Sequence, residues 1–143
     1  MIALPDVNVL LALAWANHVN HDAAHDWFGR AAADGWATCL LTQSGFLRLS
    51  MNPHVVQVAI DCRTARNLLA GVTAHPSHQF ASEAHALTAD GFDPIAELIS
   101  GYRQMTDATL FFFAHAHSLK LVTFDRAMLA VSPWPDSLEI LAS

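Results

Sequence analysis

Three aspartates lie far apart in the sequence but at corresponding points of its pattern. Asp6 follows the short apolar segment MIALP, Asp125 ends the segment LVTFD, and Asp107 begins the apolar segment TDATLFFFAHAHS just before it. Ligands of parallel α/β sheets bind beyond the carboxyl ends of the strands, so the three carboxylates could converge at one sheet edge. Such carboxylates repel one another unless a cation lies between them, and oxygen ligands suit Mg²⁺ or Mn²⁺. A bound ion of this kind generates a hydroxide nucleophile and stabilises charge on a phosphate.

Each aspartate also has an ordinary structural interpretation. Thr106 and Asp107 stand where a helix N-cap belongs, and the helix dipole favours an acid in the first turn. Asp125, which precedes Arg126, could be a turn residue. Asp6 is harder to explain in this way, because a free carboxylate between two apolar runs is costly to bury. Together, the matching positions favour one shared site over three independent structural roles.

Short apolar segments that predict strands alternate with segments of helical spacing. This alternation favours an α/β fold with a central parallel sheet covered on both faces. Residues 82–100 give no clear pattern beyond a turn at DGFDP. The predicted strands are residues 1–4, 36–41, 78–81, 119–124 and 138–141, and the predicted helices are residues 7–18, 21–35, 42–52, 57–71 and 106–118.

The composition narrows the class of protein. The 143 residues are enough for a sizeable core in a single domain that spans residues 1–143. No apolar run is long enough to cross a membrane, and the N-terminus lacks the basic flank and cleavage site of a signal peptide, so we expect a cytoplasmic protein. A net charge of −6 argues against a broad basic surface for nucleic acid, so a bound cation or a basic partner must supply positive charge.

A resemblance extends nearly from end to end. The segments DVNVLLALAW, HVNHDAAHDWF, GWATCLLTQSGFLRLSMNP and RQMTDATLFFFAHAHSLKLVTFDRAM, in this order, resemble the PIN-domain ribonucleases, and specifically the VapC toxins of bacterial toxin–antitoxin pairs. The resemblance implies a three-layer α/β/α sandwich with a central parallel sheet. It also implies a Mg²⁺ or Mn²⁺ site formed by Asp6, Asp107 and Asp125, with Asn8 holding the first loop by hydrogen bonds.

The sequence departs from the family pattern at one position. The resemblance implies a glutamate at the start of the helix after the second strand, and Gln43 stands there. An amide oxygen can touch a metal or position a water molecule, but it carries no charge and is not a base. Three aspartates could still hold one ion, so hydrolysis of RNA stays our expectation. The alternative is a catalytically impaired PIN domain that acts by binding RNA or an antitoxin.

Three hydroxyl groups and one arginine could support such a site. Ser44 and Thr123 are near the acidic positions in sequence and could contribute hydroxyls, and Thr106 precedes the second aspartate. Arg48 lies five residues beyond Gln43, so it need not face the same cavity. It resembles an arginine that recurs in this subfamily, and a phosphate contact and a structural ion pair both remain open.

The resemblance also implies partners. VapC toxins are held inactive by a VapB antitoxin with a basic tail, and they commonly form homodimers, so we expect both for this chain. A phosphotransferase with Asp6 as a covalent nucleophile is a rival, but Asn8 stands where such enzymes have a second aspartate. The histidines and the two cysteines lack metal-binding spacing, so we expect them to be structural.

Overall fold

The central feature of the fold is a five-stranded sheet in which all neighbouring strands are parallel. The computed structural model describes residues 1–143. The strand order is β3-β2-β1-β4-β5, so the order reverses between β1 and β4, where α/β sheets form their binding sites. The strands are β1 (Ala3–Pro5), β2 (Trp36–Cys39), β3 (His78–Ala81), β4 (Lys120–Thr123) and β5 (Leu138–Ile140).

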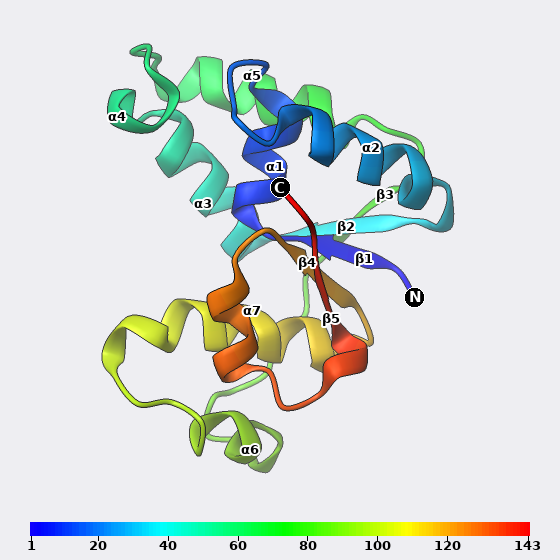
Figure 1. Cartoon of the computed structure of the whole chain (residues 1–143), viewed down its shortest axis with the longest axis vertical. Helices are drawn as coiled ribbons and strands as arrows, with labels where there is room; N and C mark the ends of the chain where they lie inside the picture. Colours follow the sequence, from blue (N-terminus) through cyan, green and yellow to red (C-terminus); the bar gives the residue numbers. More distant parts are fainter.

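Helices cover both faces of the sheet, and the predicted three-layer α/β/α sandwich is confirmed (Figure 1). One layer contains α1 (Val7–Ala14), α2 (His21–Ala31), α3 (Leu40–Ser50), α4 (Pro53–Val56) and α5 (Cys62–Thr73). The opposite layer contains α6 (Asp93–Ala96) and α7 (Met105–Ala116). Short 3-10 helices lie at Ala32–Asp34, Asp90–Phe92, Tyr102–Gln104, Arg126–Val131 and Pro135–Ser137.

The strand residues divide the core into two halves, because successive side chains of a strand point to opposite faces. Ala3 and Val122 pack with the α1 layer, whereas Leu4 and Leu121 pack with α7. Leu4 is fully buried, and a buried leucine side chain contributes about 1.5–3 kcal/mol to the free energy of unfolding. Burial on both faces therefore fixes the ends of β1 and β4, which carry the acidic residues.

Three predicted boundaries are wrong in ways that matter for the site. The strand predicted at 36–41 ends at Cys39, because the Thr42 hydroxyl accepts from the Cys39 N–H (3.0 Å) and starts α3 two residues early. The helix predicted at 57–71 begins only at Cys62, since Gln57 has a left-handed backbone (φ 68°). The last helix begins at Met105, so Thr106 and Asp107 lie within its first turn and neither is its N-cap.

Candidate active site

Asp6 lies at the junction of the sheet and the first helix. Its backbone N–H donates to the Val122 carbonyl (2.8 Å), which continues the β1–β4 ladder by one residue. Its side chain caps α1, and Oδ1 accepts from the Val7 N–H (2.7 Å). The strand and the helix that follows it therefore hold this carboxylate in one place.

The Thr123 hydroxyl ties the loops after β1 and β4 together. Thr123 is fully buried, and its Oγ1 donates to Asp6 Oδ2 (2.8 Å). The same oxygen accepts from Asn8 Nδ2 (3.0 Å) and from the Asp125 N–H (3.0 Å). Asn8 Oδ1 accepts in turn from the Phe124 N–H (3.2 Å). Two loops that are more than a hundred residues apart in sequence are thus joined by one hydrogen-bond network, which includes the predicted residues Asn8 and Thr123.

The pKa values of Asp6 and Asp107 reflect both burial and neighbouring carboxylates. Burial raises the pKa of Asp6 above its ordinary value, and the Asp125 carboxylate adds to this rise, while hydrogen bonds from Thr123 and Val7 partly oppose it. Burial also raises the pKa of Asp107, with further contributions from Asp6 and Asp125. Neighbouring negative charges have this effect because they disfavour ionisation. The structure therefore brings the three carboxylates within electrostatic reach of one another.

The three carboxylates are not arranged as a finished coordination sphere. No group of three His, Cys, Asp or Glu side chains in the chain lies close enough to hold a metal ion as it stands. The donors nevertheless suit a hard divalent cation, because they are carboxylate oxygens whose mutual repulsion such an ion would relieve. Asp125 is the most exposed of the three, and its Oδ1 accepts from the Ala127 N–H (2.9 Å).

Asp6 and Asp107 line a cleft between α3 and α7 with a volume of about 380 Å³. Ser44 and Arg48 enter this cleft from α3, and Thr106 enters it from α7. Arg48 thus faces the acidic residues, although its spacing from Gln43 did not require it to do so. The remaining lining residues are Val7, Leu40, Leu41, Gly45 and Leu110.

Gln43 does not line this cleft. Its Nε2 donates to Thr38 Oγ1 (3.0 Å), and that hydroxyl lies 2.8 Å from His78 Nε2. The α3 residues of the cleft are 40, 41, 44, 45 and 48, which form one helical face, and residue 43 lies outside this face, about 130° around the helix from its centre. The structure therefore places Gln43 against the β2–β3 edge. Sequence reasoning did not select Gly45, although a glycine inside a helix is a signal in its own right.

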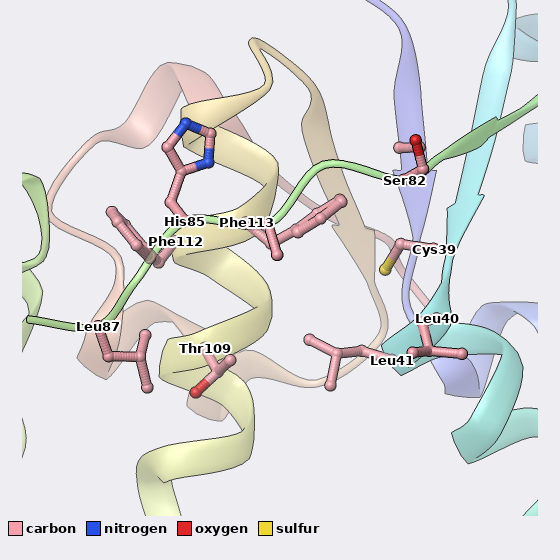
Figure 2. Close-up of a pocket in the computed structure, with 11 residues that line it drawn as sticks. Cys39, Leu40, Leu41, Ser82, His85, Leu87, Thr109, Phe112 and Phe113 are labelled. Atoms are coloured by element: carbon pink, nitrogen blue, oxygen red, sulfur yellow. The ribbon is translucent and has the colours of Figure 1, made fainter. Parts of the chain in front are cut away.

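An apolar groove adjoins the acidic cleft. It has a volume of about 300 Å³ and lies between the start of α3, the segment after β3 and the middle of α7 (Figure 2). Leu40 and Leu41 line both the groove and the cleft, and they are 73% and 43% exposed. The other lining residues are Cys39, Ala81, Ser82, Ala84, His85, Leu87, Thr109, Phe112 and Phe113. The acidic cleft therefore has an apolar surface at its side.

Four of the histidines have the structural roles that we expected. His21 Nδ1 and His25 Nε2 lie 2.7 and 2.9 Å from the carbonyls of Ala12 and Leu13, which belong to the last turn of α1. His115 Nδ1 lies 2.9 Å from the Ser137 hydroxyl, and His117 Nδ1 lies 2.9 Å from the Phe113 carbonyl. Cys39 and Cys62 are both free.

Comparisons with known proteins show the family to which the chain belongs. The family model of the PIN domain matches residues 3–132. Ribonuclease VapC38 of Mycobacterium tuberculosis (strain ATCC 25618 / H37Rv) is 42% identical over 131 residues, which cover 92% of this chain and 90% of that protein. Ribonuclease VapC39 of the same strain is 40% identical over 128 residues, or 90% and 91% of the two chains. The chain therefore belongs to the PIN-domain family, as a member of its VapC group.

A solved structure supports the fold. The chain resembles a chain in the crystal structure of VapBC2 from Rickettsia felis bound to a DNA fragment from their promoter, with a TM-score of 0.59. The match covers 99% of this chain and 100% of that chain at 14% sequence identity. No helix is both long and apolar enough to cross a membrane.

Proposed function

We propose that residues 1–143 act as a single PIN domain with metal-dependent endoribonuclease activity, which hydrolyses RNA phosphodiester bonds. The single observation that carries this proposal is the convergence of Asp6 and Asp107 on one cleft, with Asp125 tied beside Asp6 through the Thr123 hydroxyl. Bringing carboxylates together at one cleft disfavours their ionisation, and a bound divalent cation would relieve this repulsion. The names of the VapC relatives, which are ribonucleases, support RNA as the substrate.

The three aspartates would hold Mg²⁺ or Mn²⁺, which supplies a Lewis acid and lowers the pKa of a water molecule when it is bound. Thr123 and Asn8 orient the Asp6 carboxylate through their hydrogen bonds. Arg48 binds a phosphate of the RNA from the opposite wall of the cleft, because a guanidinium matches two phosphate oxygens. Ser44 and Thr106 line the same cleft, and their hydroxyls hydrogen-bond to the sugar–phosphate backbone of the RNA.

We also propose partners for this site. A VapB-like antitoxin with a basic tail would be attracted to the acidic cleft of a chain with net charge −6, and this complex would keep the enzyme inactive in the cytoplasm. The crystal structure of the Rickettsia felis VapBC2 complex supports such a partner. We propose in addition that two copies associate, since the exposed Leu40, Leu41 and Leu87 around the groove in Figure 2 give an apolar contact surface.

One observation favours the second candidate, a catalytically impaired PIN domain that binds RNA or its antitoxin. Helix α3 contributes no carboxylate to the cleft, since its lining residues are leucines, Ser44, Gly45 and Arg48. The cation would then have fewer negative ligands, which weakens its binding. Slow or absent hydrolysis together with tight RNA binding would favour this alternative.

The test is RNA cleavage by the purified protein in Mn²⁺ and in EDTA. We expect cleavage of a structured RNA in Mn²⁺, and none in EDTA or with the Asp6→Asn variant. The matched control is Asp26→Asn, because Asp26 is an exposed aspartate of α2 outside the cleft. Cleavage that persists in Asp6→Asn would mean that the activity comes from a contaminant or from another site.

A further inference from the structure

Gly45 occupies an unexpected position in the fold. It lies in the interior of α3, is buried, and lines the acidic cleft. Glycine is among the residues that favour helices least, because it has the most backbone freedom to lose. A glycine at such a position therefore needs a reason in the packing around it.

The reason is a close contact between two helices. A Cβ atom on Gly45 would lie 2.6 Å from Val7 Cγ2 and 3.5 Å from Val7 Cγ1. Real Cβ atoms do not approach other atoms this closely, and a valine side chain on a helix has one strongly preferred rotamer, so it cannot easily turn aside. Val7 is the first residue of α1, directly after Asp6. The bare backbone of Gly45 thus lets α3 rest on the first turn of α1.

The neighbours of Gly45 make this contact relevant to the site. Ser44 precedes it, and Arg48 lies one turn further along the same face of α3, and both line the cleft that contains Asp6 and Asp107. A side chain at position 45 would force α3 and the first turn of α1 apart, and Asp6 directly precedes that turn. Gly29 and Gly71 differ in this respect, because an added Cβ at either position meets nothing within 4 Å.

We propose that Gly45 is a positioning residue: by lacking a side chain, it seats α3 on Val7 and sets the width of the cleft, so that Ser44 and Arg48 reach an RNA phosphate held beside the aspartates. This inference rests on the proposed nuclease function. It assigns to α3 the binding of the substrate backbone instead of the binding of the cation. Gly45 itself touches neither substrate nor metal.

The test is a double-mutant cycle of Gly45→Ala, Val7→Ala and the combined variant, with Gly29→Ala as the matched control in α2. Cleavage is measured well below the melting temperature of each variant, with kcat and KM determined separately. RNA affinity is measured without cleavage, by fluorescence anisotropy of a labelled single-stranded RNA with each variant in the Asp6→Asn background.

We expect Gly45→Ala to lower kcat/KM by about tenfold or more, because displacing a reacting group by 1 Å can cost on the order of 100-fold. We also expect it to weaken RNA binding severalfold. Adding Val7→Ala removes both Cγ atoms from the contact and should restore most of both losses, while Gly29→Ala should change neither.

Three results would contradict the inference. Unchanged kcat/KM and RNA affinity in Gly45→Ala, even with a lower melting temperature, would show that Gly45 is only a packing residue and would leave the nuclease function intact. A combined variant that regains stability without regaining RNA affinity would have the same meaning. An unaltered protein that neither cleaves nor binds RNA would instead overturn the proposed function, and this inference with it.

Discussion

Thr123 is the residue on which the acidic site most depends. It is fully buried and donates to Asp6 Oδ2 while it accepts from Asn8 and from the Asp125 N–H. A single oxygen therefore sets the relative positions of two of the three proposed metal ligands. Residues of this kind orient a ligand without touching the ion.

We predict that Thr123→Val lowers cleavage activity by about 10–100-fold, as is typical when a residue that orients a metal ligand is lost. The variant should also lose about 1–3 kcal/mol of stability, because the Asn8 amide and the Asp125 N–H lose a buried acceptor. Thr123→Ser is the control, since it keeps the hydroxyl and should retain most of the activity. Equal activity of the valine and serine variants would contradict this role.

The face of α3 that lines the cleft leads to a second prediction. Ser44 lies in the cleft, whereas the Gln43 amide donates to Thr38 on the neighbouring strand. Ser44→Glu should therefore raise the affinity of the protein for Mn²⁺, measured by calorimetry. Gln43→Glu should leave that affinity unchanged and cost about 1 kcal/mol of stability through the lost hydrogen bond. A gain in Mn²⁺ affinity with Gln43→Glu alone would show that residue 43 can reach the cation.

At the scale of the elements, the sequence predicted the strands well and one helical face poorly. Apolar runs identified β2, β4 and β5 within two residues, because the covered strands of a parallel sheet need such runs. Strand β3 has its predicted bounds, although its sequence HQFA is partly polar and its two middle residues are exposed. The start of α3 was predicted at residue 42, yet it is Leu40. A shift of two residues corresponds to about 200° of helix rotation, so the helical pattern alone could not predict which face of α3 lines the cleft, and Gln43 was selected only by its match to the family pattern.

The edge strand β3 should respond to pH. Burial lowers the pKa of His78 below its ordinary value of 6.5, so the neutral ring is favoured in the folded chain. Its contribution to stability is present above pH 6.5 and is lost as the pH falls through the lowered pKa. We predict that the β3 amide hydrogens exchange faster with solvent as the pH falls through the lowered pKa of His78, after the rates are corrected for intrinsic exchange.

Strand β5, the other edge of the same sheet, contains no histidine and serves as the internal control. His78→Gln should remove the pH dependence at β3. If both edge strands changed in parallel with pH, the effect would be global and would not come from His78.

At the scale of the whole molecule, the acidic site should make the metal-free protein less stable as the pH rises. Asp6 and Asp107 have raised pKa values in the folded chain, so their effect is most favourable below their ordinary value of 3.8 and worsens as the pH rises through the raised values. The contribution of Asp61 to stability changes with pH in the opposite direction, because the hydrogen bond from the Thr64 N–H lowers its pKa. The difference between the unaltered protein and Asp6→Asn therefore isolates the contribution of Asp6.

We predict that in EDTA at neutral pH Asp6→Asn melts roughly 2–4 °C above the unaltered protein, if removing the buried charge gains about 1 kcal/mol. The difference should shrink as the pH falls through the raised pKa of the Asp6 carboxyl, because the neutral acid no longer carries the unfavourable charge. Mn²⁺ should raise the melting temperature of the unaltered protein more than that of the variant, because a ligand stabilises the state that binds it. Calorimetry over this pH range checks both statements, and a variant that melts lower at neutral pH would contradict them.

The whole-molecule arrangement was predictable because it depends on topology. Each of the three aspartates was found by its place after a strand or before one, and the parallel sheet brings such places together at one edge. The position of Gly45 against Val7 was not predictable, because it depends on how closely two helices pack. The topology thus allowed the acids of the candidate site to be predicted, whereas the close packing of Gly45 on Val7 gave no comparable signal in the sequence.

The most direct test of the account is the anomalous difference density of a Mn²⁺-soaked crystal of the unaltered protein. We predict one peak between Asp6, Asp107 and Asp125, with carboxylate oxygens about 2.1 Å away and the Thr123 hydrogen bond to Asp6 preserved. Peaks only at other acidic residues, or carboxylates that stay apart at saturating Mn²⁺, would contradict the claim that these three aspartates form one cation site.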